Sequence, residues 1–290
     1  MKHCRVCGIP ADVEGVELDE EGVCRACRSQ LPHLPDPGEL RERVIEELES
    51  HDRVAVAVSG GLDSLAALVL AARHCREVTM VTVDTGAIHP EAWRRLHLAR
   101  RRLDVEWRVV GDVDTFLELF ERRLPRNQSP CGPCSKMIER RCERAARELG
   151  VDALVTGHEL PHGTDPVVPK DPPVIRAMCG LPERERRELV REELGLSPRK
   201  LAGYTSNCVV LPFALKRFHE EHGYSFEAPR LAAMVRMGYL SKREMWERLE
   251  PPGEEELRGL LEECRGWIPR RLERLLRETL SSASGPESGE

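Results

Sequence analysis

Residues 54–64 read Val54-Ala55-Val56-Ala57-Val58-Ser59-Gly60-Gly61-Leu62-Asp63-Ser64 and decide the fold. The first five residues are apolar, as in a buried strand, and residues 62–74 have the apolar spacing of a helix. Gly60 and Gly61 have no Cβ atom, so the backbone between strand and helix can adopt positive φ and turn several N–H groups toward an anion. The N-terminus of the following helix attracts the same anion. This arrangement predicts a phosphate-binding loop.

The polar residues of the loop suit a nucleotide. Ser59 and Ser64 supply hydroxyl donors, and Asp63 can orient a magnesium ion or cap the helix. The glycines are not followed by the Gly-Lys-Ser/Thr of a Walker loop, and they lack the spacing of the dinucleotide fingerprint. The pattern Ser-Gly-Gly-x-Asp-Ser instead resembles the PP-loop of the ATP pyrophosphatases, within the adenine nucleotide alpha hydrolase superfamily. The resemblance implies cleavage of ATP between the α and β phosphates, adenylation of a carbonyl oxygen, and displacement of AMP by a nitrogen or sulfur nucleophile.

Composition limits the class of protein. The chain has 290 residues, 40% hydrophobic and 32% charged, which is typical of a globular protein. No apolar run is long enough for a membrane span or a secretory signal, so we expect a cytoplasmic protein with no membrane partner. Residues 94–147 hold 14 Arg and Lys against 8 Asp and Glu. This surplus could meet a nucleic-acid backbone, although solvated helix faces with ion pairs would give the same count.

Apolar strands alternate with amphipathic helices along the centre of the chain, which predicts an α/β fold with a parallel, doubly wound, HUP-like sheet. We expect strands at 53–58, 78–83, 105–110 and 151–156, and helices at 39–50, 62–74, 90–102, 115–124, 135–149, 183–194 and from 242 onward. Prolines between 160 and 173 argue against regular structure there. Ligands bind at the carboxyl ends of such strands. The predicted ATP-binding residues at those ends are Ser59, Gly60, Gly61, Asp63, Ser64, Asp84, Gly157 and His158, with Gly111 at the same edge.

The chain divides into five predicted regions. Residues 1–30 form a small zinc module, and 31–50 a proline-rich linker and a helix. Residues 51–215 form the ATP-binding domain, 216–280 a C-terminal helical region, and 281–290 a disordered tail.

Seven of the eleven cysteines fall into patterns. Cys4 and Cys7 are paired with Cys24 and Cys27 in the spacing of a zinc site with four thiolate ligands. A module of this size that is rich in Glu and Gly cannot build a sufficient core, so zinc would supply most of its folding free energy. Four thiolates leave no open coordination position, and we therefore predict a structural site.

Cys131 and Cys134 form a second Cys-x2-Cys pair, directly before the helix expected near residue 135. Thiolates at a helix N-terminus are stabilised as anions. By itself the pair fits a redox dithiol, half of a metal site or a sulfur-transfer pair. A third cysteine, Cys208, lies in an isolated segment after a charged insertion. Three thiolates can hold a 4Fe-4S cluster with one iron left open for sulfide or a substrate atom.

The N-terminal cysteine module, the 59–64 loop, the second cysteine pair and Cys208 together resemble the iron–sulfur-dependent tRNA thiolases that make 2-thiouridine or 2-thiocytidine. The resemblance runs from residue 1 to about 215. It implies ATP, Mg2+, Zn2+ and a 4Fe-4S cluster, the cluster being bound by Cys131, Cys134 and Cys208. The sequence Val83-Asp84-Thr85-Gly86 followed by Pro90-Glu91 also resembles the phosphoadenosine-phosphosulfate reductase branch, which shares the fold and handles sulfur.

Two features depart from the thiolase pattern. Thr156-Gly157-His158 is followed by Glu159-Leu160-Pro161-His162, where thiolases usually have an acidic pair that helps to hold magnesium or activate the substrate. Glu159 or Asp165 could substitute. The C-terminal zinc ribbon of some thiolases has no counterpart, because Cys264 stands alone after Cys208. Both departures bear on tRNA as the substrate more than on ATP-dependent sulfur insertion.

The sequence thus predicts an enzyme, an AMP- and pyrophosphate-forming sulfurtransferase. Asp63, Lys136, Cys131, Cys134 and Cys208 are its expected catalytic residues. Lys136 would neutralise the α phosphate or assist proton transfer, unless it is a solvated lysine in the first helical turn. His158 would contact phosphate, unless it is a packed loop histidine.

Other readings stay open. The acceptor is a tRNA or a small molecule such as a free nucleobase, and the sulfur donor is sulfide or a sulfur-carrier protein. A persulfide on Cys131 or Cys134, resolved by Cys208, would replace the cluster. The chain could also assemble as a homodimer. The alternative to an enzyme is a nucleotide-sensing or RNA-binding protein that has no catalytic activity.

Overall fold

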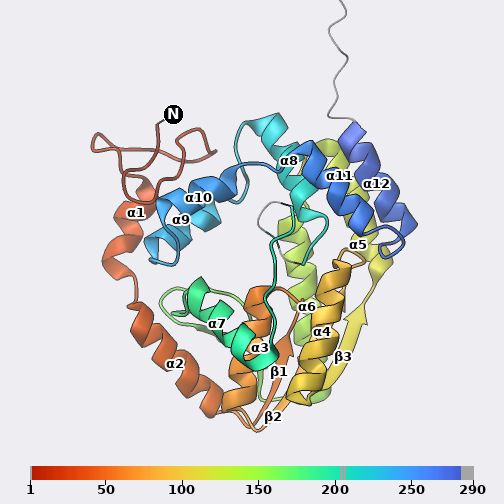
Figure 1. The fold of residues 1–290 in the computed structure, drawn as a ribbon. Coiled ribbons are helices and arrows are strands. Elements are labelled where there is room, and N and C mark those ends of the chain that lie inside the picture. The colour runs from red at the N-terminus through yellow and green to blue at the C-terminus, as the bar shows by residue number, and fades with distance from the viewer. Residues whose placement is uncertain (1, 203–204, 206, 282–290) are drawn as a thin grey trace, which may run out of the picture.

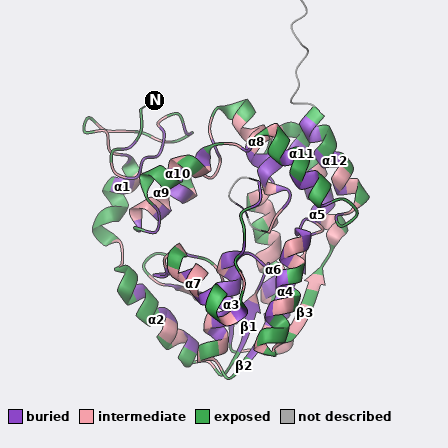
Figure 2. Ribbon diagram, viewed as in Figure 1, coloured by how far each residue is buried: buried purple, intermediate pink, exposed green. Residues whose placement is uncertain are grey.

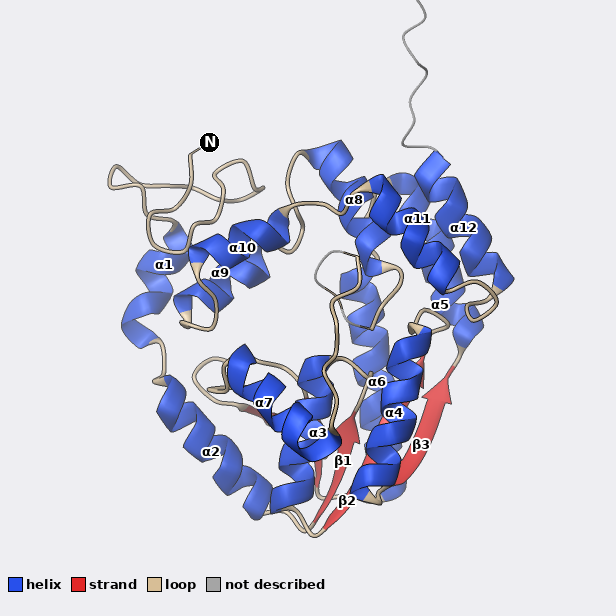
Figure 3. Ribbon diagram, in the orientation of Figure 1, coloured by secondary structure: helices blue, strands red, loops and turns tan. Residues whose placement is uncertain are grey.

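A six-stranded, mostly parallel sheet lies among helices in the lower part of the view (Figures 1 and 3). The computed structural model describes residues 2–202, 205 and 207–281. The strand order is β3-β2-β1-β4-β6-β5, and β5 alone is antiparallel to its neighbour among these strands. Their bounds are β1 (Arg53–Ala57), β2 (Glu77–Asp84), β3 (Glu106–Gly111), β4 (Ala153–Thr156), β5 (Val167–Val168) and β6 (Val174–Arg176). The α/β fold class predicted from the sequence is confirmed.

Helices cover both faces of the sheet. On one face lie α2 (Pro37–Glu49), α3 (Leu62–His74), α4 (Pro90–Leu103) and α7 (Glu183–Leu194), and on the other α5 (Val113–Arg123) and α6 (Cys131–Leu149). Side chains alternate along β1 as the period of a strand requires: Val54 and Val56 join the first core, and Ala55 joins the second. The buried residues concentrate along β1 and the inner sides of the helices (Figure 2).

The topology places a switch point beside β1. From β1 the chain moves outward through β2 and β3, and it then returns to the other side of β1 with β4. Crossovers therefore leave in opposite directions from β1 and β4, and the loops at their carboxyl ends are free to form a ligand site.

Several elements differ from the prediction. The segment with many prolines contains β5, and β6 follows it, because β6 pairs with β4 and gives β5 an edge to join. Helix α6 begins at Cys131 and not near residue 135, so Cys131 and Cys134 lie within its first turn. In the C-terminal part of the chain, where we predicted a helical region over 216–280 but gave helix bounds only from 242 onward, α8 (Leu211–His222) and α9 (Ala228–Arg236) precede α10 (Lys242–Leu249), α11 (Glu254–Glu263) and α12 (Arg270–Ser281).

The N-terminal module packs against α10. The ring of His3 meets Trp246 edge-on with centroids 5.8 Å apart, and a Cβ on Gly8 would lie 2.9 Å from the Met245 side chain. The module includes α1 (Arg25–Gln30), and the short helix η1 (Leu31–His33) links it to α2. A second short helix, η2 (Leu124–Arg126), follows α5.

The predicted disordered tail begins one residue too early, because Ser281 is the last residue of α12, and residues 282–290 lie outside the described residues. Within the described residues, no helix combines the length and apolar character that a membrane span requires.

Candidate functional site

The glycine loop after β1 has a tightly constrained backbone. Gly60 has φ +76°, and a Cβ there would lie 2.6 Å from the carbonyl oxygen of Ala92 on α4. Its own carbonyl accepts a 2.9 Å hydrogen bond from Nε of the buried Arg95. Gly61, by contrast, has φ −79°, so positive φ is needed at only one of the two glycines. The loop is thus fixed from α4 before any ligand binds.

Hydroxyl groups close the loop. Ser64 Oγ accepts a 3.1 Å hydrogen bond from the Ser59 amide and lies 3.3 Å from Ser59 Oγ. It also donates to the Gly61 carbonyl. Gly157 at the end of β4 packs against this loop, because a Cβ there would lie 2.8 Å from the Ser64 nitrogen. The loops after β1 and β4 therefore meet at the switch point of the sheet.

A cavity of about 480 Å³ opens beside this loop. Of the residues predicted from the sequence, those that line it are Ser59, Gly61, Asp63, Ser64, Cys134, Gly157, His158 and Cys208. Its walls also include apolar side chains from the strands and α6, among them Val81, Phe120, Ile138 and Leu154. One cavity therefore joins the glycine loop to two of the three cysteines beyond the N-terminal module that we predicted to act together.

Four predicted residues lie elsewhere. Among the described residues, Gly60, Asp84, Cys131 and Lys136 are not part of the cavity lining. Asp84 accepts a 2.8 Å hydrogen bond from the Gly86 amide and shapes the turn after β2. Lys136 is exposed on α6. The cations that do line the cavity come from other segments and are Lys170, Arg176, Arg186, Arg187, Lys200, Arg230 and Arg248. The roles of Asp84 and Lys136 remain predictions.

Backbone pairing brings Cys208 to the end of β2. Ile88 and Cys208 form an antiparallel bridge, flanked by hydrogen bonds from the Val209 amide to Ala87 and from the His89 amide to Asn207. Cys208 and the first turn of α6 are close enough that the charge of Cys208 raises the pKa of Cys131 and Cys134, after the larger effect of burial. Cys208 therefore lies near the first turn of α6, although the two segments are distant in sequence.

Burial opposes the thiolate forms in the absence of a metal. It raises the pKa of Cys134 to about 12, and it raises the pKa values of Cys131 and Cys208 as well. The stabilisation expected from the N-terminus of α6 is therefore outweighed by desolvation. A cationic iron cluster would reverse this balance. Cys134 and Cys208 lie on the cavity wall, and Cys131 lies three residues before Cys134 in the first turn of α6.

Asp63 and Glu159 belong to one ion network that lines the cavity. Arg186 Nη1 lies 2.7 Å from Asp63 Oδ1 and 3.7 Å from Glu159 Oε2. Arg230 Nη1 donates to Glu159 Oε1 at 2.6 Å. Glu159 is buried, whereas Asp165 is half-exposed, pairs with Arg43 and does not line the cavity. Of the two acidic residues considered as substitutes for the thiolase pair, Glu159 is the one at the site.

His158 lines the cavity, and part of the residue is exposed to solvent. Its Nδ1 lies 3.0 Å from Thr156 Oγ1. Burial lowers the pKa of His158, and Arg176 lowers it further. The ring is therefore kept neutral near pH 7 and can contact a ligand as a hydrogen-bonding group.

The N-terminal cysteines form a compact metal-binding geometry. The sulfur atoms of Cys4, Cys7, Cys24 and Cys27 all lie within 4.8 Å of one another. Two of the separations are 3.8 Å (Cys4 to Cys27) and 3.7 Å (Cys7 to Cys24), and a tetrahedron of ~2.3 Å zinc–sulfur bonds has sulfurs about 3.8 Å apart. All four residues are buried, so the site fits a closed, structural zinc ion.

The sequence predicts 183–194 only as a highly charged helix and does not identify Arg186 or Arg187, the two cavity cations on α7. A signal was present, because Arg186 precedes Leu189 and Val190 by three and four positions and therefore shares their buried face. A charged residue on the apolar face of a helix is uncommon, and here it marks the wall of the site.

The sequence of this chain is similar to those of known proteins, and one of the matches covers the glycine loop described above. The phosphoadenosine phosphosulfate reductase domain model matches residues 53–158, which hold the glycine loop and the second cysteine pair. Uncharacterized protein MJ1599 of Methanocaldococcus jannaschii is 30% identical over 86% of this chain and 93% of its own length. The chain belongs to the PP-loop superfamily.

Other PP-loop relatives are named as tRNA-modifying enzymes. A tRNA-cytidine(32) 2-sulfurtransferase of Variovorax paradoxus is 26% identical over 50% of this chain and 52% of its own length. A tRNA-specific 2-thiouridylase MnmA of Desulfosudis oleivorans is 33% identical over 40% of this chain and 35% of its own length. The matches to these two enzymes therefore span about half of their length or less.

Proposed function

We propose that this PP-loop protein is an ATP-dependent sulfurtransferase that replaces a carbonyl oxygen of a nucleoside in tRNA with sulfur. One observation carries the proposal: a single cavity is lined by the PP-loop residues Ser59, Asp63 and Ser64 and by Cys134 and Cys208. An adenylating site and a sulfur-delivering site must adjoin, because the activated carbon has to meet the sulfur before water reaches it. The names of the tRNA-modifying relatives support the choice of acceptor.

The chemistry needs ATP, the acceptor and sulfide. The acceptor carbonyl oxygen attacks the α phosphorus of ATP, and the bond to the β-phosphate oxygen breaks to release pyrophosphate. Sulfur then bonds to the activated carbon, the carbon–oxygen bond breaks, and the former carbonyl oxygen leaves on AMP. The amides and hydroxyls of residues 59–64 would stabilise the charge that develops on the departing pyrophosphate.

Two groups would be held by named residues. Asp63 would help to bind Mg2+, which offsets phosphate charge. Cys131, Cys134 and Cys208 would bind a 4Fe-4S cluster that leaves one iron open to sulfur. The neutral ring of His158, on the same cavity wall, would contact a phosphate or the acceptor.

Anaerobic purification tests the cluster. We expect about four iron and four sulfide per chain, lost on Cys134→Ala and kept on Cys142→Ala, the matched control on the same helix and cavity wall. A colourless protein with full activity would favour the persulfide route through Cys131 or Cys134.

Mass spectrometry of nucleosides tests the acceptor. Cells that lack the protein should lose one thiolated nucleoside and regain it on complementation. The match to the phosphoadenosine phosphosulfate reductase domain supports a second candidate, sulfur transfer with a small-molecule acceptor. An unchanged nucleoside profile, together with pyrophosphate release on adding ATP and a small acceptor, would select that candidate. If the protein turned over no ATP with either kind of acceptor, the result would favour a nucleotide-binding protein that is not an enzyme.

A further inference from the structure

Arg186 is a buried cation with one nitrogen unused. Only 2% of the residue is exposed, and it lines the cavity from α7. Its Nη2 is buried and has no hydrogen-bond partner. A buried donor without a partner costs free energy, and more so on a charged group. Nitrogens of this kind are uncommon in folded proteins, so the buried Nη2 points to a ligand.

The other two nitrogens fix the guanidinium plane. Nε donates to the Leu181 carbonyl at 2.7 Å, and Nη1 donates to Asp63 Oδ1 at 2.7 Å. Because the guanidinium is a rigid fork, these two bonds also set the directions of the N–H groups on Nη2. Arg186 is therefore oriented before any ligand enters.

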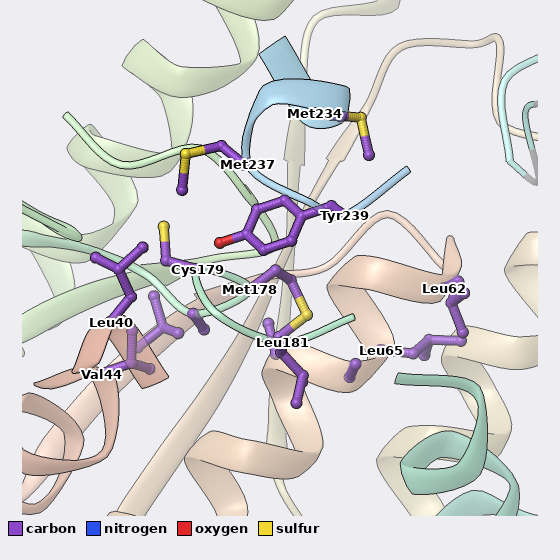
Figure 4. Close-up of a cluster of buried hydrophobic side chains, with 14 of the residues drawn as sticks. Leu40, Val44, Leu62, Leu65, Met178, Cys179, Leu181, Met234, Met237 and Tyr239 are labelled. Atoms are coloured by element: carbon purple, nitrogen blue, oxygen red, sulfur yellow. The ribbon is translucent and has the colours of Figure 1, made fainter. Parts of the chain in front are cut away.

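The carbonyl that anchors Nε is itself held by the core. Leu181 belongs to a cluster in which side chains from α2, α3 and the segments around 178 and 237 meet (Figure 4). The Tyr239 hydroxyl accepts a 2.6 Å hydrogen bond from the Gly180 amide next to Leu181. This packing explains why the start of α7 has a fixed position relative to the PP-loop.

The neighbouring charges favour an anion at Nη2. Arg186 already neutralises Asp63 of the PP-loop, and Glu159, which lies near the same Nη1, is paired with Arg230. Both carboxylates are thus occupied through Nη1 and Arg230, and neither bonds Nη2. Arginine forks bind phosphate oxygens well, and the anion closest in the proposed reaction is the polyphosphate held by the same loop as Asp63.

We propose that Arg186 Nη2 binds a β- or γ-phosphate oxygen of ATP and keeps hold of it in the pyrophosphate product. This inference rests on the proposed function, since it takes the PP-loop to be the polyphosphate site. It assigns a phosphate-binding residue to α7, outside the 53–158 segment that the family model matches. Asp63 then has a second task, which is to orient Arg186.

Binding measurements on the full chain test the assignment. Arg186→Gln should weaken the binding of ATP and of inorganic pyrophosphate about ten- to a hundred-fold, which is the typical contribution of a hydrogen bond from a charged donor. The affinity of this variant for AMP, which lacks those phosphates, should stay within about two-fold of the wild-type affinity. Arg186→Lys keeps the positive charge but lacks the forked guanidinium, so its affinity for ATP and pyrophosphate should lie between those of the wild type and Arg186→Gln. The matched control is Arg184→Gln, because Arg184 lies on the exposed side of the same helix and pairs with Glu188.

The outcomes separate the possible failures. If the wild-type protein binds neither ATP nor pyrophosphate, the proposed function fails. If it binds both and Arg186→Gln binds them equally well, only the role of Arg186 is overturned. Equal losses for ATP, pyrophosphate and AMP would indicate a structural defect and would contradict a phosphate-specific role.

A crystal structure of the wild-type chain with a nonhydrolysable ATP analogue gives a test free of folding defects. A β- or γ-phosphate oxygen should lie within hydrogen-bond distance of Arg186 Nη2. A nucleotide seated in the loop while Nη2 contacts only water would overturn the inference.

Discussion

At the scale of single residues, the PP-loop depends on one glycine more than on its neighbour. A side chain at Gly60 would need an unfavourable positive φ and would contact the Ala92 carbonyl. We expect Gly60→Ala to lower the free energy of unfolding by at least about 1–3 kcal/mol and to abolish ATP binding. Urea unfolding and calorimetric titration measure the two effects. Gly259→Ala in α11, where a Cβ meets nothing within 4 Å, is the control and should not destabilise. Equal stability of the two variants would contradict this account of the loop.

Glu183 predicts a pH dependence of stability. It accepts hydrogen bonds from Arg187 and Arg248, and these outweigh burial and lower its pKa from 4.5 to about 2. Because the folded pKa is depressed, its contribution is complete above about pH 4.5 and is lost as the pH falls toward 2. Glu183→Gln should cost on the order of 2–3 kcal/mol at pH 7 and progressively less in acid. Urea unfolding from pH 7 to pH 3 tests this.

A matched variant isolates that effect. Glu188→Gln removes an exposed carboxylate that pairs with Arg184 on the same helix, and exposed pairs contribute little. Its cost should stay below about 1 kcal/mol across the same pH range. A Glu183→Gln penalty that did not shrink in acid would mean that the lost packing, and not the charge, was responsible.

At the scale of elements, the folding of the N-terminal module should depend on its metal, and loss of the metal should change the surroundings of α10. The four buried sulfur atoms surround a zinc-sized space, and the module contacts α10 through His3 and Trp246. Zinc chelation should unfold residues 2–30, release about one zinc per chain and change the fluorescence of Trp246. Trp246→Phe should remove the fluorescence change without altering the zinc content. A module that resists proteolysis after complete zinc loss would refute the dependence.

At the scale of the whole molecule, the C-terminal helices share a core with the sheet. Leu276 of α12 is fully buried in the cluster that also contains Phe116 and Phe120 of α5 and Ala55 of β1. We expect Leu276→Ala to cost about 2–5 kcal/mol and to shift one cooperative unfolding transition monitored by circular dichroism. Leu31→Ala, at a residue 40% exposed, should change stability by less than about 0.5 kcal/mol. A separate early transition in the Leu276 variant would show that the 216–280 region unfolds by itself.

The sequence by itself determined the features that are written in local patterns. The period of the apolar residues fixed the strands and helices around 53–156, the glycines fixed the turn after β1, and the spacing of Cys4, Cys7, Cys24 and Cys27 predicted the compact sulfur site. Each of these depends on interactions between residues that lie close in the chain or recur at a fixed interval.

Tertiary structure decided which distant residues share the cavity. No local pattern states that Arg186 reaches Asp63, that Cys208 pairs with the segment after β2, or that β6 adds to the sheet beside β4. Proximity to Cys134 in the sequence favours Lys136 as the cation of the site, yet the cations that line the cavity come from other segments. The physical reason is that helical and strand periods specify which side of an element is buried, whereas the partner buried against it is set by the packing of the complete chain.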